Sequence, residues 1–238
     1  MLELKNISFQ AEDEKEILKD VSLKIDDKIV VITGPNGGGK STLAKVIAGI
    51  VTPTGGQILL DGEDITGYSV TERANAGISL AFQQPVRFKG LTVRDLITIA
   101  AGKELNVSEA CSYLTEVGLC AKDYIDRELN ASLSGGEIKR IEIATILARG
   151  SKFSIFDEPE AGIDLWSFQS LIRVFEKMQK EYKGTILIIS HQERILDIAD
   201  KIIYIKDGMV EQYGPKDEIL KTLINAAQPG CDVLMQKI

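Results

Sequence analysis

A glycine-rich stretch near the N-terminus is the part of the chain best suited to bind phosphate. It consists of Gly34, Pro35, Asn36, Gly37, Gly38, Gly39, Lys40, Ser41 and Thr42. It follows a short apolar run that ends at Ile32, and a helical pattern comes next. Glycines let consecutive N–H groups turn toward phosphate oxygens, and the helix N-terminus adds a partial positive charge. We expect Lys40 to reach the β and γ phosphates and Ser41 to ligate Mg²⁺, the alternative being a plain glycine-rich turn.

Two adjacent carboxylates follow another apolar run. Residues 153–156 predict a buried strand, and Asp157 and Glu158 come at its end. In open parallel sheets, ligands bind beyond the carboxyl ends of the strands. Taken alone, this pattern is more typical of a solvated turn or a helix cap. With the phosphate loop upstream, we expect Asp157 to hold Mg²⁺ and Glu158 to polarise the attacking water.

A serine and two glycines precede another helical pattern. Leu133 is followed by Ser134, Gly135, Gly136 and Glu137, and apolar residues then recur at Ile141, Ala144, Leu147 and Ala148. The spacing of Ser134 and Glu137 fits a capping box and predicts an amphipathic helix. A helix N-terminus of this kind is also an anion site, and both interpretations can be true.

The Leu-Ser-Gly-Gly-Glu stretch is the signature of the ATP-binding cassette (ABC) family, which the chain resembles over residues 1–220. The resemblance rests on six elements in family order: the phosphate (Walker A) loop 34–42, Gln83, the signature 133–137, Asp157 with Glu158, Asp164 and His191. It implies an ATPase that uses ATP and Mg²⁺. In similar proteins two copies pair head to tail around two nucleotides. The signature of one copy, Ser134 included, then closes over the γ-phosphate held by the other.

The resemblance assigns roles to three more polar residues. Gln83 would sense Mg²⁺ and water at one end of its loop and a partner protein at the other, although a polar surface loop is the simpler local account. His191, the single histidine, would contact the γ-phosphate, whereas a lone histidine is otherwise usually structural. Asp164 would act across the dimer, with a helix cap as an equally good local account. The aromatic that many members stack on adenine is missing near residues 11–14, with Phe9 two positions early, so we expect loose base selectivity.

The elements that must position these residues alternate between strands and helices. Short apolar runs at 28–32, 153–156 and 185–189 predict strands covered on both faces of a parallel sheet. Helical spacing between them predicts an α/β fold, a P-loop NTPase core with a mainly parallel sheet. The opening stretch and residues 56–61 predict a separate N-terminal antiparallel sheet.

A mainly helical segment interrupts this alternation, with candidate helices at 92–101 and 108–118. No repeats or linkers mark a second folding unit, so we expect one domain. Its expected division over 1–238 is a nucleotide-binding core (1–87 and 134–228), a helical subdomain (88–133) and a surface tail (229–238).

The bulk composition narrows the function classes. The chain of 238 residues carries a formal net charge of -7 and no Lys/Arg block, which argues against a nucleic-acid or lipid-phosphate partner. Cys111, Cys120 and Cys231 form no disulfide framework, so a reducing, cytoplasmic location is expected. Cys111 and Cys120 fall at helical positions where buried thiols are common, and their spacing fits no cluster motif. No apolar window suits membrane insertion, so a membrane role would need a partner.

Three stretches, residues 80–85, 133–140 and 191–194, resemble the SufC ATPases of the SUF iron–sulfur cluster assembly system. This resemblance implies two copies that bind a SufB- or SufD-like scaffold through the Gln83 loop and the helical subdomain. ATP-driven dimerisation would then deform the scaffold. Pro159 is frequent instead in transporter subunits, and the helical subdomain is short for SufC. The alternative is therefore an ATP-binding subunit that energises an ABC membrane transporter through a membrane permease.

Other classes fit less well. A nucleotide-gated interaction subunit without turnover is disfavoured by the intact Glu158 and His191. Chromosome-maintenance ATPases carry long heptad insertions that this chain does not have. Tandem translation-factor ATPases need two cassettes, and one is present.

Overall fold

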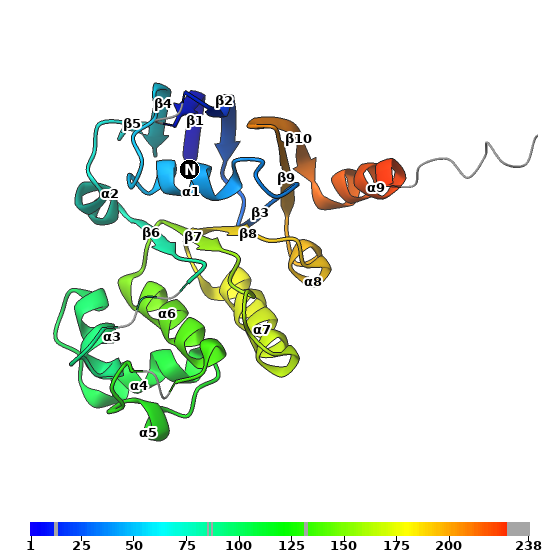
Figure 1. The fold of residues 1–238 in the computed structure, drawn as a ribbon. Helices are drawn as coiled ribbons and strands as arrows, with labels where there is room; N and C mark the ends of the chain where they lie inside the picture. The colour runs from blue at the N-terminus through cyan, green and yellow to red at the C-terminus, as the bar shows by residue number, and fades with distance from the viewer. Residues whose placement is uncertain (12–13, 85, 87, 131–132, 228–238) are drawn as a thin grey trace, which may run out of the picture.

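A six-stranded sheet runs through the middle of the molecule (Figure 1). The computed structural model describes residues 1–11, 14–84, 86, 88–130 and 133–227. The strand order is β10-β9-β3-β8-β7-β6, and every neighbouring pair is parallel except β10 with β9. The strands are β3 (Ile29–Thr33), β6 (Ile78–Ala81), β7 (Phe153–Asp157), β8 (Thr185–Ile189), β9 (Lys201–Lys206) and β10 (Met209–Pro215). The predicted mainly parallel sheet is confirmed.

Both faces of this sheet are buried. Val31 and Ile188 belong to a core cluster on one face, whereas Val30 and Ile189 belong to a second cluster on the other. Side chains alternate between the faces of a strand, so continuous apolar runs supply both clusters at once. The charged residues of the parallel strands β3, β6, β7, β8 and β9 accordingly lie only at the strand ends.

A second, antiparallel sheet covers one face together with helix α1 (Figure 1). Its strand order is β2-β1-β4-β5, which confirms the predicted N-terminal antiparallel sheet. These elements are β1 (Leu2–Gln10), β2 (Glu16–Ile25), β4 (Gly55–Leu60), β5 (Glu63–Asp64) and α1 (Lys40–Ile47), with α2 (Val70–Ala76) before β6.

The remaining helices lie toward the other face or at the edge of the sheet (Figure 1). They are α3 (Val93–Ala101), α4 (Val107–Glu116), α5 (Ala121–Tyr124), α6 (Gly135–Arg149), α7 (Leu165–Glu181), α8 (Glu193–Asp197) and α9 (Lys216–Ala227). Helix α6 lies among α3, α4 and α7. The expected amphipathic pattern of α6 is wrong, because Ile138, Ile143 and Ile146 are buried on different sides of this helix. The helical subdomain covers the face that would otherwise meet water.

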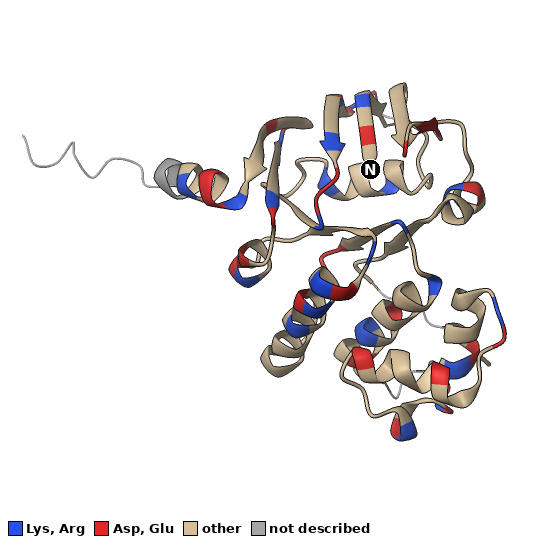
Figure 2. Cartoon of the chain, turned by 180° about the vertical axis from the view of Figure 1, so that it is seen from behind, with Lys and Arg blue, Asp and Glu red and all other residues tan. Residues whose placement is uncertain are grey.

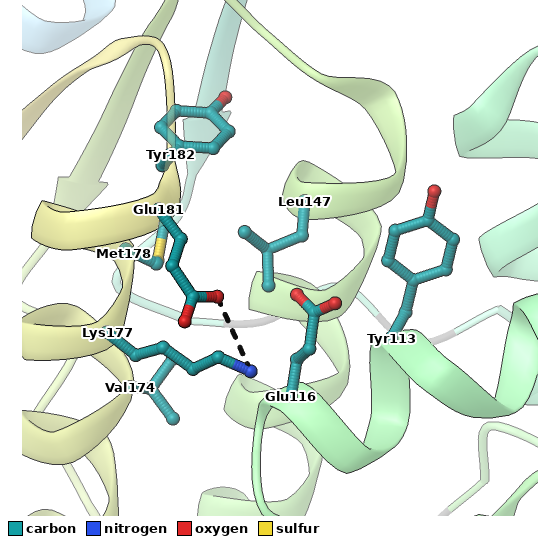
Figure 3. A pocket seen from close by; sticks show the side chains of 8 residues that line it. All are labelled: Tyr113, Glu116, Leu147, Val174, Lys177, Met178, Glu181 and Tyr182. Atoms are coloured by element: carbon teal, nitrogen blue, oxygen red, sulfur yellow. Dashed lines mark ion pairs between the residues drawn. The ribbon is translucent and has the colours of Figure 1, made fainter.

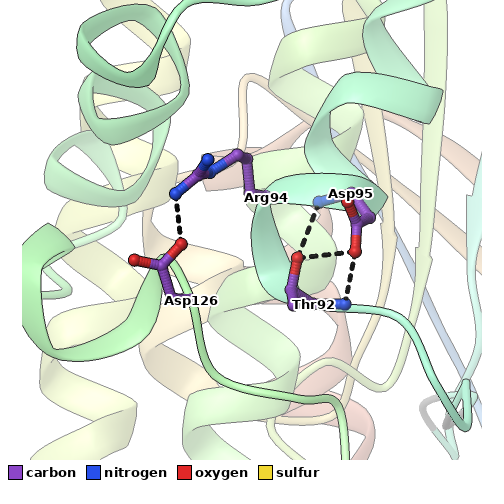
Figure 4. Close-up of polar contacts among 4 residues, drawn as sticks. All are labelled: Thr92, Arg94, Asp95 and Asp126. Atoms are coloured by element: carbon purple, nitrogen blue, oxygen red, sulfur yellow. Dashed lines mark hydrogen bonds and ion pairs between the residues drawn. The ribbon is translucent and has the colours of Figure 1, made fainter.

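Helix α3 of the helical subdomain is fixed at its N-terminus by local polar contacts (Figure 4). Thr92 and Asp95 form a capping box in which the Asp95 carboxylate accepts from the backbone N–H and the hydroxyl of Thr92. Arg94 forms an ion pair with Asp126, which lies beyond α5. The cap is worth about 1 kcal/mol and the exposed ion pair less.

The helical subdomain does not close completely on α7. A hollow of about 230 Å³ lies between α4, α6 and α7 (Figure 3). Tyr113 and Glu116 border it from α4, and the ion pair of Lys177 with Glu181 borders it from α7. Contact between the helical subdomain and the core therefore runs mainly through α6.

The two cysteines of the helical subdomain differ in their exposure to solvent. Cys111 is half-buried in α4, but Cys120 is exposed at the N-cap of α5, so a buried thiol there was a wrong expectation. Cys231 and the tail 229–238 lie outside the described residues.

Charges of both signs are interspersed along α7 (Figure 2). Within the described ranges, none of the helices combines the length and apolar character needed to cross a bilayer.

Candidate functional site

The phosphate loop connects the C-terminal end of β3 to the first turn of α1. Its backbone is forced into this path at Gly34, where φ is 135°. A Cβ at Gly34 would lie 1.9 Å from the backbone oxygen of Ile205, so no other residue fits there. The loop therefore lies tightly against β9 at the edge where the parallel strands end.

Helix α1 begins without a capping side chain. Its N-cap is Gly39, no side chain accepts from its first N–H groups, and no acidic residue occupies its first turn. By contrast α2, α3, α4 and α6 all begin with a complete capping box. The free N–H donors and the helix dipole of α1 suit an external anion. The loop thus fits the phosphates of a nucleotide.

Lys40 is the cation of this loop. It is buried, and its Nζ donates to the carbonyl oxygens of Gly34 at 2.8 Å and Pro35 at 2.9 Å. Burial lowers the pKa of Lys40, while the charges of Glu158 and Asp157 oppose that effect. A cation already held over the loop is placed to exchange its carbonyl acceptors for phosphate oxygens.

Ser41 and Asp157 meet across the sheet edge, as expected for two magnesium ligands. The Ser41 hydroxyl donates to Asp157 Oδ1 at 3.0 Å. Burial raises the pKa of Asp157, and the hydrogen bond from Ser41 opposes it. Mg²⁺ prefers hard oxygen ligands and uses one or two protein groups plus phosphates and water. Among the described residues, no cluster of three or more acidic, histidine or cysteine side chains is placed to hold a metal.

Glu158 lies directly beyond β7 in a strained backbone conformation, with φ at 46°. Its Oε2 accepts a hydrogen bond from Gln83 Nε2 at 2.5 Å. Gln83 therefore lies against the expected catalytic carboxylate, and its role toward Mg²⁺ stays a prediction. Since a non-glycine residue at positive φ needs support from its surroundings, Glu158 is held by its neighbours.

His191 follows β8 and faces the same edge. Its Nδ1 lies 3.5 Å from the hydroxyl of Thr33, the last residue of β3. Partial burial and the charge of Lys40 lower the pKa of His191. The preceding Ser190 donates to Glu160 Oε1 at 2.5 Å and accepts from the backbone N–H of Gln192 at 3.0 Å. The Asp157–Glu158 segment and the histidine loop are thereby joined.

The signature is not part of this cluster within one chain. Ser134 caps α6 with a complete capping box shared with Glu137. Helix α6 packs on the face of the sheet opposite α1. Ser134 and Gly135 are exposed, so the signature can meet a phosphate held by another molecule.

Asp164 serves as a helix cap. Its Oδ1 accepts from the backbone N–H groups of Trp166 at 2.9 Å and Ser167 at 3.0 Å. The local account of this residue is thereby confirmed, and a role across a dimer stays a prediction. Phe9 packs, partly buried, against the core beside α1, while residues 12–13 lie outside the described residues.

Three charged residues that the fold buries wholly or partly were not identified from the sequence. Lys139 is buried, and its Nζ donates to the main-chain oxygen of Glu158 at 2.9 Å. Glu142 accepts from the backbone N–H of Phe82 at 3.2 Å, and burial raises its pKa to about 7. Arg73 donates to carbonyls at the end of α1. Lys139 and Glu142 lie beside Ile138, Ile141 and Ile143, and that apolar context is the available signal.

A parallel sheet whose strand ends carry a glycine loop, a buried lysine and a serine–aspartate pair defines a P-loop nucleoside triphosphatase. Comparison with known proteins narrows this class. The family model described as ABC transporter matches residues 18–161. The chain belongs to the ABC transporter family, and it is an ATPase that uses ATP and Mg²⁺.

Similar proteins cover most of the chain. An uncharacterised ABC transporter ATP-binding protein of Methanocaldococcus jannaschii is 39% identical over 86% of this chain and 85% of its own length. A probable ATP-dependent transporter, ycf16, of Pyropia yezoensis is 36% identical over 90% and 91%. Among solved structures, a dimeric ATP-binding cassette bound to ADP and Pi matches with a TM-score of 0.80 at 26% identity, covering 91% of this chain and 99% of that one.

Proposed function

We propose that this ATPase works as a head-to-tail dimer, in which the phosphate loop of one copy and the signature of the other enclose each ATP. The observation that carries the proposal is the position of Ser134 on the face of the sheet opposite α1. Its exposed helix N-terminus is suited to an anion that its own phosphate loop does not offer. The similar cassette solved as a dimer with ADP and Pi supports this arrangement.

Within each site the residues divide the chemistry. Lys40 and the N–H groups of α1 bind the phosphates. Mg²⁺, held by Ser41 and Asp157, would neutralise charge on the phosphate oxygens. Glu158 polarises the attacking water, and His191 contacts the γ-phosphate. Gln83 donates to Oε2 of Glu158, which leaves Oε1 of the carboxylate to accept from water.

We further propose that a partner protein binds beside the Gln83 loop. Phe82, Val86, Phe88 and Ile99 are exposed apolar side chains, with Ile99 at 63%. They line a groove of about 250 Å³ against α6. Exposed apolar patches of this kind mark interaction sites. The groove borders Glu142, whose carboxylate holds the backbone of Phe82, so a bound partner contacts the loop that carries Gln83.

The partner proposed first is a soluble SufB- or SufD-like scaffold of iron–sulfur cluster assembly. It is supported by the likeness of residues 80–85, 133–140 and 191–194 to SufC. A membrane permease is the second candidate, favoured by Pro159 and by relatives named as transporter proteins. In both cases ATP-driven closure does work through the different affinity of the partner for two states.

An anaerobic affinity purification from the protein's own cells tests the choice of partner. The tagged chain is compared with its Ile99→Asp variant, which places a charge in the groove but lies outside the nucleotide site. A soluble scaffold with bound iron and sulfide, lost in the variant, supports the SUF-type role. A polytopic membrane protein, lost in the same way, overturns that role and makes the chain a transporter subunit.

A further inference from the structure

Helix α7 begins with two large apolar side chains that are exposed to solvent. Leu165 is 66% exposed and Trp166 is 81% exposed. Trp166 is the single tryptophan of the chain, and the Asp164 side chain fixes its backbone as part of a helix cap. Tryptophan is enriched at the energetic centres of protein interfaces. An exposed indole on a backbone fixed by Asp164 is therefore an interface candidate.

The signature and this apolar pair belong to one continuous surface. A Cβ on Gly136 would lie 2.8 Å from Ser167 Oγ, and a Cβ on Gly135 would lie 3.2 Å from the Gly162 backbone oxygen. The N-termini of α6 and α7 are thus packed directly against each other, with no side chain of Gly135 or Gly136 between them. Any molecule that faces Ser134 also comes close to Trp166.

The other half of the site offers a large, mainly apolar hollow. A groove of about 990 Å³ begins at phosphate-loop residues 34–36 and His191, and its wall includes Leu196, Leu220 and Leu223. Its lining is predominantly apolar, and its volume far exceeds that of an indole ring. The wall comes from α8 and α9, beyond the nucleotide-contacting residues.

We infer that Trp166 of one copy docks into this groove of a second copy, with Leu165 beside it. The inference rests on the proposed head-to-tail dimer, which brings the signature surface of one copy onto the phosphate loop of the other. A buried indole N–H needs an acceptor, and Glu193 and Asp197 border the groove. Two-fold symmetry gives two such contacts, one beside each nucleotide.

This contact would tie dimer closure to His191. The indole enters a groove that His191 itself lines, while Asp164 precedes the indole by two residues. Nucleotide in one site would therefore stabilise an apolar contact made by the copy that contributes the signature. Two copies would then be held together by this apolar contact as well as by the nucleotide phosphates between them.

Trp166 also reports on its own burial, which allows a direct test. The full chain carrying Glu158→Gln is examined with and without Mg·ATP by sedimentation, tryptophan emission and acrylamide quenching in the same samples. We expect an ATP-dependent dimer, a blue-shifted emission and reduced quenching. Trp166→Ala should weaken dimerisation by about 30-fold for each of the two contacts, as for an interface hot spot. Leu220→Asp in the groove should weaken it similarly.

Ile99→Ala, which removes an exposed apolar side chain of similar accessibility elsewhere, serves as the control and should dimerise like the parent. A dimer whose indole stays as exposed as in the monomer overturns the docking inference and leaves the head-to-tail dimer standing. So does a dimer that Trp166→Ala and Leu220→Asp fail to weaken. A chain that binds ATP by calorimetry yet stays monomeric overturns the dimer and the docking inference together.

Discussion

Replacing Lys40 by alanine should weaken nucleotide binding. The size of the effect is set by the two hydrogen bonds that Lys40 already makes without nucleotide. Without nucleotide, Lys40 Nζ already donates to two neutral carbonyl oxygens, at 2.8 and 2.9 Å. Binding replaces these acceptors with charged phosphate oxygens. Hydrogen bonds to charged groups are worth about 1.5–3 kcal/mol, against about 0.5–1.5 kcal/mol for neutral ones. Two exchanged bonds therefore contribute about 2–3 kcal/mol, so Lys40→Ala should raise the Kd for Mg·ATP by roughly 30- to 150-fold.

Isothermal titration calorimetry measures this directly, with Lys180→Ala as the matched control. Lys180 is exposed on α7, so its replacement changes the net charge by the same amount without touching the loop. The control should bind ATP like the unmodified chain. A Kd for Lys40→Ala within about threefold of the control, less than 1 kcal/mol, would refute the assignment of the phosphate loop.

Three further predictions concern charged side chains of the site and of the core. Glu158→Gln should keep nucleotide affinity but slow phosphate release by about 10²- to 10⁴-fold, since the water loses its polarising carboxylate; wild-type turnover would contradict this. Arg73→Met should lower the free energy of unfolding by about 2–5 kcal/mol, because the buried carbonyls of Val46 and Ile47 lose their side-chain donor. Arg94→Met, at an ion pair in which Arg94 is half-buried, should cost at most about 1 kcal/mol by urea denaturation. Burial raises the pKa of Glu142 from its usual 4.5 to about 7 in the folded protein. The protonated side chain therefore contributes to stability below pH 4.5, and this contribution is lost as the pH rises to 7. Relative to Glu142→Gln, the wild type should lose about 3 kcal/mol of unfolding free energy between these limits, and parallel pH profiles of the two proteins would refute the prediction.

The sequence was sufficient for the parts of the site that are contiguous in the chain. The phosphate loop and the Asp157–Glu158 pair each follow an apolar run, and parallel strands bring their ends to one edge. Local chemistry therefore predicted Ser41 beside Asp157. The two candidate helices were predicted equally well, since α3 and α4 each begin within one residue of the expected start.

Burial that results from the packing of one helix on another could not be predicted from the periodicity of the sequence. The burial of α6 on several sides results from the helical subdomain packing over it. For the same reason the sequence did not show that the fold buries Lys139 and half-buries Glu142. The contact of Gln83 with Glu158 joins residues 75 positions apart, and no local pattern specifies it. Cys120 lies at the N-cap of α5 and not inside a helix, so helical periodicity did not predict its exposure.

The most direct test of the account is the dependence of ATP hydrolysis on protein concentration. Phosphate release by the purified wild-type chain is measured at saturating Mg·ATP over a wide dilution series, with Glu158→Gln as the blank. If each site needs the phosphate loop of one copy and Ser134 of another, activity per chain must rise with concentration and level off as the dimer saturates. Activity per chain that stays constant down to concentrations at which sedimentation shows only monomer would contradict the shared site.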